Sequence, residues 1–361
     1  MAEVSTKPEV WSCKTVQEVV ENGGELPSRY IWIRNDRSDY GPIDLNVPVA
    51  TEIPVIDFTR LQLSSSSSSS AIDEELLKLR SALTTWGCFQ AINHRIENSF
   101  LDEVRHLARE FFHLPMSEKQ KTGRTENDYE GYGNDIILFE NQPLDWTDRL
   151  YLLVSPQDNQ KLEYFPQTPQ SFRKMLHDYT IEMKRVQAEL LKSIARSLDL
   201  AEDCFVKRFG ERGTMYARFN YYPPCSRPDL VHGLKPHADG SGLTILLQDD
   251  KVEGLQMLKG DQWFRVPVMP YALLVNIGDQ LEIMSNGIYK SPVHRALTNA
   301  ENERNTLAMF CAPDPTLEIE PVEELVDNEK KPRLFKKVKN YPETYFQYYQ
   351  QMKRPIDAVR I

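Results

Sequence analysis

The sequence has few of the features that mark secreted, membrane or nucleic-acid-binding proteins. Its 361 residues include only five cysteines, scattered and without a CxxC pair, so neither a disulfide framework nor a cysteine-based zinc site is expected. No apolar run approaches the roughly 18 residues of a membrane span, and the N-terminus, MAEVSTKPEV, does not resemble a signal peptide. The net charge of −10 disfavours contact with nucleic acid and anionic membranes. We therefore expect a monomeric, cytoplasmic protein that binds neither nucleic acid nor membranes.

The first part of the chain has mainly helical patterns. Apolar residues recur every three or four positions in three segments, which predicts amphipathic helices. These helices are expected over residues 71–85, 97–112 and 171–200. Short apolar segments at 51–58 and 86–93 predict two strands. Between them, the run of serines from Ser64 to Ser70 predicts a surface loop.

The pattern changes after Gly210, where short strands follow one another without long helices. Strands are expected over residues 215–222, 243–247, 255–258, 263–267, 272–277, 289–293 and 306–311. Closely spaced strands of this kind indicate an antiparallel sandwich or barrel. An aromatic-rich helix over 341–353 follows. The sequence thus predicts an α+β protein with a helical N-terminal half beside a β-rich C-terminal region of about a hundred residues.

Three residues of the β-rich region could share a metal ion. His237 and Asp239 come just before a predicted strand, and His294 follows much later at another strand end. Two imidazoles and one carboxylate on the inner wall of a barrel can occupy one face of an octahedron, as in non-haem Fe(II) oxygenases. The three remaining positions stay open for chemistry. A His-x-Asp pair alone is weak support, and each residue taken singly is more often an ordinary core residue.

The neighbouring sequence contains groups that suit a dicarboxylate. Arg304 and Thr306 begin the strand after His294, and a buried guanidinium beside a hydroxyl can bind a carboxylate. Tyr222 lies fifteen residues before His237 and could add a third hydrogen bond. The plainer alternative is that Arg304 lies on the surface of a strand and that Tyr222 packs in the core.

Taken in order, these segments resemble the plant 2-oxoglutarate- and Fe(II)-dependent dioxygenases, nearest to the branch of senescence-related, norcoclaurine-synthase-like and codeine-demethylase-like proteins. The resemblance is carried by NYYPPC, HADG, LTILLQD, VEGLQ, WFRVP and LLVNIGDQLEIMSNGIYKSPVHRA, and in the N-terminal half by IPVIDF, WGCFQAINH, FFHLP and EGYG. It extends over residues 53–351, nearly the whole chain. It implies a double-stranded β-helix, a cupin-like jelly roll, with a helical N-terminal domain and a C-terminal helix.

The resemblance also divides the chain. The expected parts are a leader over 1–50, a dioxygenase N-terminal domain over 51–165, supporting helices over 166–210, the jelly-roll domain over 211–315 and a helical cap over 316–361.

The resemblance assigns roles to individual residues. His237, Asp239 and His294 match the iron ligands and hence the catalytic centre. Residues matching the co-substrate site are Arg304, Thr306, Tyr222 and, less directly, Asn220. Phe310 matches an aromatic residue of the substrate pocket, and Tyr132, Arg149 and Tyr151 are further candidates for that pocket, with Tyr345 of the C-terminal helix. For Tyr132 and Tyr151, simple packing in the core is the favoured alternative. Arg149 could bind a substrate carboxylate or phenolate, or form a surface salt bridge instead.

Two positions depart from the family pattern. The co-substrate site usually contains Arg-x-Ser, whereas this chain has Thr306, which keeps the hydroxyl and adds a methyl group. The family's NHG becomes NHR, and Arg95 could alter that turn because glycine tolerates positive φ more readily than arginine.

The family implies an enzyme that uses Fe(II), 2-oxoglutarate and O₂, with ascorbate as reductant, and releases succinate and CO₂. We expect hydroxylation or O-demethylation of a small aromatic plant metabolite, such as an alkaloid, a phenylpropanoid or a hormone-like compound. Two main alternatives stay open: an iron oxidase of the same fold with another co-substrate, and a catalytically idle ligand-binding relative. A hydrolytic zinc enzyme is a minor third, since zinc binds similar ligands.

Overall fold

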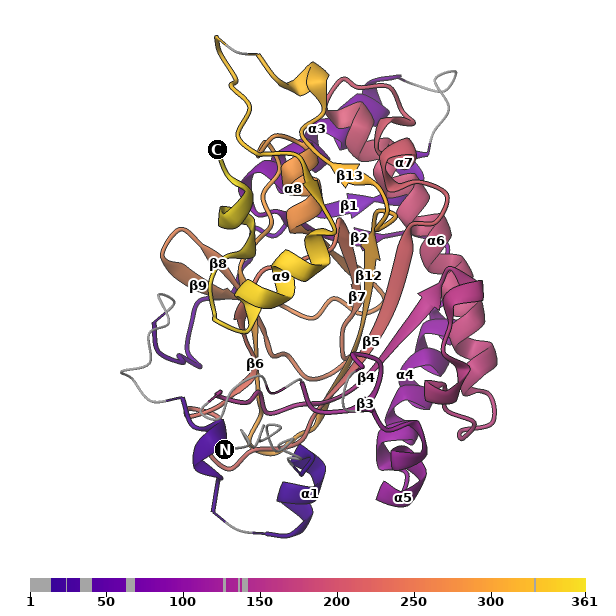
Figure 1. Ribbon diagram of the computed structural model, residues 1–361, viewed down its shortest axis with the longest axis vertical. Coiled ribbons are helices and arrows are strands. Elements are labelled where there is room, and N and C mark those ends of the chain that lie inside the picture. Colours follow the sequence, from indigo (N-terminus) through magenta and orange to yellow (C-terminus); the bar gives the residue numbers. More distant parts are fainter. Residues whose placement is uncertain are drawn as a thin grey trace, which may run out of the picture.

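The computed structural model describes residues 14–23, 25–32, 41–62, 69–125, 128–135, 137, 142–327 and 329–361. Two sheets face each other at its centre, and helices cover the outer side of the larger one (Figure 1). Within the described ranges, no helix is long and apolar enough to cross a lipid bilayer.

The larger sheet has eight strands in the order β1-β2-β10-β7-β12-β5-β4-β3. Their bounds are β1 Val55–Asp57, β2 Cys88–Ile92, β3 Gly131–Gly133, β4 Asp148–Ser155, β5 Thr214–Tyr222, β7 Leu243–Leu247, β10 Leu273–Ile277 and β12 Arg304–Ala312. All neighbouring pairs are antiparallel except β1 with β2. Four of these strands come from the first half of the chain. The N-terminal region therefore combines its helices with strands that extend the jelly-roll sheet.

The smaller sheet has four strands in the order β6-β11-β8-β9. Their bounds are β6 His232–His237, β8 Leu255–Lys259, β9 Gln262–Arg265 and β11 His294–Leu297. A separate two-stranded sheet joins β13 Glu318–Ile319 to β14 Val338–Lys339. The two main sheets form the predicted jelly roll, and the α+β class is confirmed.

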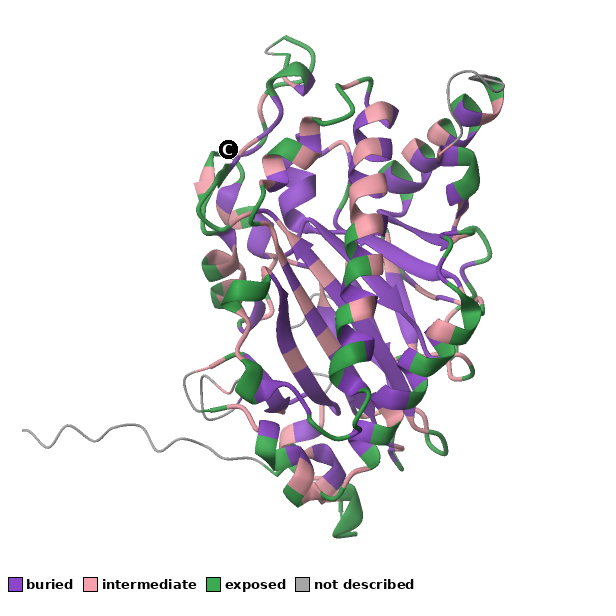
Figure 2. Ribbon diagram, turned by 90° about the vertical axis from the view of Figure 1, so that its right-hand side faces the viewer, coloured by how far each residue is buried: buried purple, intermediate pink, exposed green. Residues whose placement is uncertain are grey.

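Helices pack mainly on one side of the large sheet (Figure 1). The α-helices are α1 Val16–Glu21, α2 Phe58–Leu61, α3 Ser69–Thr85, α4 Asn98–His113, α5 Met116–Lys119, α6 Phe172–Ser197, α7 Cys204–Phe209, α8 Asp279–Met284 and α9 Tyr341–Tyr349. Short 3₁₀ turns occupy Ser28–Tyr30, Gln120–Thr122, Gln157–Asn159, Leu162–Tyr164, Glu323–Leu325 and Pro355–Val359. The long helix α6 lies across the sheet with its outer side exposed and its inner side buried (Figure 2). Its Phe172 ring lies 5.2 Å from the ring of Phe219 on β5.

Strands β5 and β12 separate core from cavity by simple alternation. Successive side chains of a strand point to opposite faces of the sheet. On β5, the buried Ala217 and Phe219 belong to the main hydrophobic core, whereas Tyr216 and Arg218 line a cavity on the other face. On β12, Met309 lies in the same core, whereas Phe310 lines the cavity. The same two strands thus supply both stability and a binding surface.

Several predicted boundaries change. The strand predicted over 289–293 is wrong: β11 begins at His294, since Pro292 has no N–H and Ser291 donates its backbone N–H to Glu282 at 2.7 Å. The first strand is shorter than predicted, because Phe58 begins α2. Strand β6 ends at His237, although the sequence places this residue before a strand. The serine run lies outside the described residues, apart from its last two members, which begin α3.

The turn at Arg95 keeps the conformation that glycine would favour. Its φ is +65°, in the left-handed region, and its side chain is exposed. The turn is therefore retained with arginine at this position, although its backbone conformation is uncommon for a residue that has a Cβ.

Candidate active site

Pairing between two short strands places the two histidines side by side. His237 is the last residue of β6 and His294 is the first of β11, and the two are direct partners in the antiparallel ladder. Their ring centroids are 4.3 Å apart. Residues far apart in sequence thus meet because of strand register, and Asp239 follows in the loop that leaves β6.

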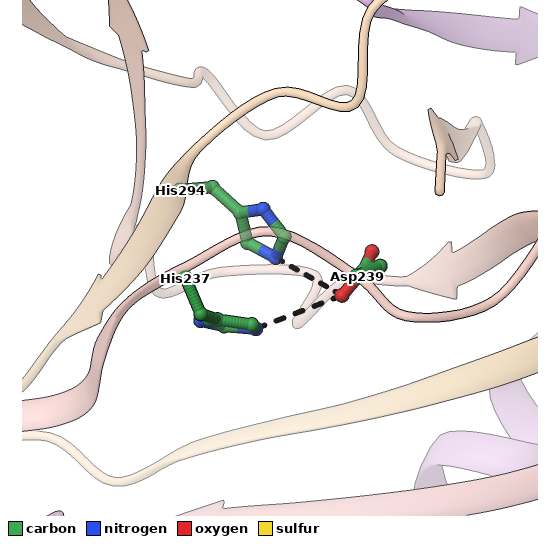
Figure 3. A group of neighbouring side chains, drawn as sticks. All are labelled: His237, Asp239 and His294. Carbon is green, nitrogen blue, oxygen red and sulfur yellow. Dashed lines mark ion pairs between the residues drawn. The ribbon is translucent and has the colours of Figure 1, made fainter. Parts of the chain in front are cut away.

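The three side chains converge on one point (Figure 3). A carboxylate oxygen of Asp239 lies 3.6 Å from Nε2 of His237 and 3.6 Å from Nε2 of His294. One nitrogen or oxygen from each residue lies within 4.8 Å of the others. All three side chains are nearly inaccessible to solvent.

Hydrogen bonds orient both rings. Nδ1 of His237 lies 2.8 Å from the carbonyl of Lys235, and Nδ1 of His294 lies 3.1 Å from the carbonyl of Pro292. If each Nδ1 donates its proton to that carbonyl, each Nε2 keeps a lone pair directed at Asp239. Burial lowers the pKa of His294 to about 4, despite the nearby carboxylate. The ring is therefore neutral at physiological pH, as a metal ligand must be.

Asp239 is held in its ionised form. Burial alone would raise its pKa, but His294, His237 and hydrogen bonds outweigh this effect and keep the pKa below its ordinary value. Asn276 on β10 donates a long hydrogen bond of 3.4 Å to its second oxygen. Two imidazoles and a carboxylate are a donor set that suits Fe(II) and leaves part of the coordination sphere open. The residues present therefore fit the expected metal.

The predicted co-substrate residues lie together on paired strands β5 and β12. Tyr222 is the register partner of Arg304, and Asn220 is the partner of Thr306. The Arg304 guanidinium lies 5.3 Å from the centroid of the Tyr222 ring, and Nδ2 of Asn220 donates to the Thr306 hydroxyl at 3.2 Å. All four side chains are buried, so Arg304 is not a surface residue.

A cavity of about 370 Å³ opens beside the histidines, bounded by the large sheet, the end of β6 and helix α9. It is lined by Asp128, Tyr129, Glu130, Asp135, Arg149, Tyr151, Lys161, Thr214, Tyr216, Arg218, Leu234, His237, Asp239, Gly240, Ser241, Gln280, Phe310, Ala312, Pro315, Asn340, Pro342, Tyr345, Phe346, Tyr349 and Gln350. Its size suits a small organic molecule.

Helix α9 closes one side of this cavity next to the metal ligands. The Tyr345 hydroxyl donates to the carbonyl of Ala238 at 2.9 Å, between His237 and Asp239 in the chain. Its ring stacks on Tyr349 at 5.5 Å. A Cβ added at Gly240 would lie 2.5 Å from the Tyr345 ring. The absence of a side chain at position 240 therefore lets α9 approach the metal-binding loop.

The structure brings together three of the four predicted substrate residues. Phe310, Tyr151 and Arg149 line the cavity. Tyr132 does not: its ring lies 5.8 Å from that of Phe111 in the core, and its hydroxyl donates to Gln17 at 3.1 Å. Tyr132 therefore packs in the core, the alternative favoured for it from the sequence, and is not a pocket residue, because β3 turns that side chain toward the helices.

Arg149 is neither exposed nor unpaired. Its Nε donates to Asp135 at 2.8 Å, and both side chains are largely buried at the cavity. Sequence reasoning missed Asp135 and also Arg218, which bonds to the same carboxylate. Arg218 could have been found, because it precedes Asn220 by two residues on one strand and so shares its face. No sequence signal connects Asp135 to either arginine.

The fold and the three converging side chains define a mononuclear, non-haem metal enzyme of the jelly-roll type. Comparison with known proteins identifies the family. Residues 213–313 match the 2OG-Fe(II) oxygenase superfamily, and residues 53–171 match the N-terminal domain described as non-haem dioxygenase in morphine synthesis. The chain belongs to the 2-oxoglutarate- and Fe(II)-dependent oxygenases, and its cofactor and co-substrate are Fe(II) and 2-oxoglutarate.

The similarity to known proteins extends over nearly the full length of this chain. Protein SRG1 of Arabidopsis thaliana is 39% identical over 352 residues, with 96% of each chain covered. Codeine O-demethylase of Papaver somniferum is 41% identical over 328 residues, covering 90% of this chain and 89% of the relative. The crystal structure of JOX2 in complex with 2OG, Fe and JA superimposes with a TM-score of 0.83 at 33% identity, over 97% of this chain and 98% of the other.

Proposed function

We propose that this enzyme hydroxylates or O-demethylates a small metabolite with an apolar ring system, and that it couples this reaction to conversion of 2-oxoglutarate into succinate and CO₂. The observation that carries the proposal is the position of the cavity. It contacts His237 and Asp239 directly, and its lining includes several aromatic side chains, among them Tyr151, Tyr216 and Phe310. A bound molecule would therefore lie beside the metal and away from bulk water.

We assign the metal to His237, Asp239 and His294. When bound there, Fe(II) supplies the activation of O₂ that lets a C–H bond be oxidised. The protein's part is to fix the three donor atoms. The carbonyls of Lys235 and Pro292 orient the imidazoles, and burial lowers the pKa of His294.

We assign the distal carboxylate of 2-oxoglutarate to Arg304 and the Thr306 hydroxyl, with Tyr222 and Asn220 as supporting groups. A buried guanidinium can form a paired, charge-assisted interaction with a carboxylate. The hydrogen bond from Asn220 fixes the Thr306 hydroxyl oxygen, so that the hydroxyl proton is available to an acceptor. The methyl group of Thr306 limits the rotation of that hydroxyl.

The substrate side is assigned to the aromatic wall. The rings of Tyr151 and Tyr216 stack at 5.1 Å and are nearly parallel, and Phe310 lies 6.4 Å from Tyr151. Aromatic rings bind flat, apolar groups well. One relative is named codeine O-demethylase, which supports O-demethylation as one form of the reaction.

The test is anaerobic titration of metal-free protein with Fe(II) and then 2-oxoglutarate. We expect the weak visible charge-transfer band of an iron–2-oxoglutarate chelate, and its loss in His294→Ala and weakening in Arg304→Ala. Succinate release in air should follow the same order. If iron binds to the wild type but no band forms, 2-oxoglutarate is not the co-substrate and the proposal fails.

A further inference from the structure

One wall of the cavity carries two buried arginines that share a single carboxylate. Nε of Arg149 donates to Asp135 at 2.8 Å, and Nη2 of Arg218 lies 3.3 Å from the same oxygen. All three residues line the cavity. Burial alone would raise the pKa of Asp135, but the two arginines outweigh it and hold the pKa well below its usual range. The group thus consists of two cations and one anion.

The neighbouring Lys235 is already paired. Lys235 bonds to Asp145 through both its backbone N–H, at 2.8 Å, and its ammonium, at 3.2 Å. Asp145 is thus engaged by Lys235 and, among the described residues, forms no ion pair with either arginine. A buried cation without a partner is costly, whereas a bound anion would complete the pairing.

The acidic groups in the cavity lining are also occupied. Asp128 pairs with Lys161, and Glu130 accepts from the backbone N–H of Leu153 at 2.7 Å and lies 3.5 Å from Lys161. A cationic ligand at this position would have to compete with Lys161. At the arginine pair itself, two cations share one carboxylate, so the charge available to a ligand there is positive.

Both arginines also keep unused donors. Arg149 uses Nε for Asp135 and Nη1 for the carbonyl of Tyr129, and Arg218 uses Nε for Asn220 and Nη2 for Asp135. Across the described part of the chain, Nη2 of Arg149 and Nη1 of Arg218 make no hydrogen bond, and neither is a fully buried atom. A guanidinium donor facing a cavity is suited to a carboxylate.

We propose that the substrate is a small monocarboxylic acid with an apolar ring system, and that its carboxylate binds to Arg149 and Arg218. Asp135 is the built-in counter-charge that restricts this site to one negative charge. This inference rests on the proposed function and narrows its substrate class. The aromatic wall of Tyr151, Tyr216 and Phe310 then receives the ring system, beside the metal ligands.

The test measures binding rather than turnover. Isothermal titration calorimetry of the anaerobic Fe(II)–2-oxoglutarate enzyme would compare three acids with their own primary amides: naphthalene-1-acetic acid, indole-3-acetic acid and 4-hydroxycinnamic acid. The acid and amide of each pair have nearly the same shape. For the acids that fit the cavity, we expect affinity about 10- to 100-fold above that of the amide. If no acid binds more tightly than its amide, the proposal is wrong.

Two substitutions should change the preference for acid over amide in opposite directions. Arg149→Gln removes one cation and should reduce the preference for acid over amide by about tenfold or more. Asp135→Asn removes the anion and should increase that preference. The double variant restores the net charge and should bring the preference back toward the wild type. Arg212→Gln, which alters an exposed ion pair with Asp158, is the matched control and should change nothing.

These outcomes separate a binding role from a structural one. If the cluster only stabilises the fold, both single variants would weaken acids and amides alike, and the proposal would be overturned. If Asp135→Asn lowers the preference for acids, the assignment of Asp135 is also wrong. The chelate band with 2-oxoglutarate reports separately on the proposed function, since a wild type that prefers acids but forms no band refutes only that function.

Discussion

The two faces of the large sheet carry side chains of different kinds. On the face toward α6, residues such as Phe219 and Met309 are apolar and tightly packed. On the opposite face, the adjacent Asn220 and Phe310 belong to a polar or cavity-lining surface. Neighbouring residues on one strand therefore serve different purposes. Substitutions at adjacent positions should affect either stability or activity, and this contrast can be tested residue by residue.

The largest effect on activity should come from substitution of the proposed metal ligands. Asp239→Ala or His294→Ala should reduce succinate formation by more than about 100-fold, because loss of a ligand costs more than loss of an outer hydrogen-bond partner. The melting temperature of the metal-free protein should change little by comparison. His106→Ala, at an exposed position on α4, is the control. Substantial turnover by either variant would contradict the assigned ligands.

On the core face, Phe219→Ala should destabilise the protein by about 3–5 kcal/mol, since a fully buried aromatic ring is lost. Urea unfolding would measure this change. The neighbouring Asn220→Ala should instead weaken 2-oxoglutarate binding with a smaller loss of stability. If the two variants change stability and binding equally, the division between the two faces does not hold.

On the cavity face, Arg304→Lys should raise the KM for 2-oxoglutarate by about 10- to 100-fold, because an ammonium cannot reproduce the paired donors of a guanidinium. Initial rates of succinate release at varied 2-oxoglutarate give this value. Thr306→Ser keeps the hydroxyl and should change KM by less than about threefold. An equal effect of the two substitutions would argue against a role for the guanidinium in carboxylate binding.

Asp148 and Arg149 extend the comparison to β4, because these adjacent charged residues lie on opposite faces. Asp148 accepts from the backbone N–H groups of Val16 and Gln17 at 2.7 and 2.9 Å, at the start of α1. Burial raises its pKa to about 6, although these hydrogen bonds oppose the shift. The folded state therefore keeps a proton that the unfolded state releases as the pH rises above 3.8, the ordinary pKa of an aspartate side chain.

Because of Asp148, the free energy of unfolding should fall as the pH rises from 3.8 to about 6. Above about pH 6 this loss of stability should be complete. Asp148→Asn removes the titration, so the melting temperature of the variant relative to the wild type should increase from pH 4 to pH 7. The gain corresponds to roughly 2–3 kcal/mol. Asp158→Asn, at an exposed site, should show no such trend. A constant difference across this pH range would show that Asp148 is not the group responsible.

The smallest effect should come from the aromatic wall. Phe310→Ala should weaken binding of the best ring-containing ligand of the calorimetric panel by about tenfold, through loss of ring contact. Binding of 2-oxoglutarate should be unchanged. The neighbouring Met309→Ala should lower stability by about 2–5 kcal/mol instead. Unchanged ligand affinity in Phe310→Ala would place the bound ring elsewhere in the cavity.

The residues that lie in short continuous motifs could be named from the sequence together with the family resemblance. His237 and Asp239 are two positions apart, and Arg304 and Thr306 share one strand face, so their proximity follows from local geometry. The meeting of His237 with His294 required the family resemblance, since only strand pairing joins them. Both pairs could therefore be named before the structure was known.

Other features depend on tertiary contacts that no local pattern encodes. Strand β4 was missed because Asp148 and Arg149 interrupt its apolar run, and both charges are buried only through partners elsewhere in the fold. The choice between pocket and core for Tyr132 depended on a similar contact, because the face that β3 presents is set by its pairing with β4. Asp135 reaches the two arginines from a different segment, so its role could not be derived from spacing.

The alternation along β5 limits how this enzyme can change during evolution. Insertion or deletion of one residue within the strand would exchange the two faces, turning Arg218 and Asn220 into the core and Phe219 toward the metal. Such a change would lose folding and co-substrate binding together. New substrate preferences should therefore arise by substitution within β5 and β12. Changes in length are better tolerated in the loops that connect the strands than within the strands themselves.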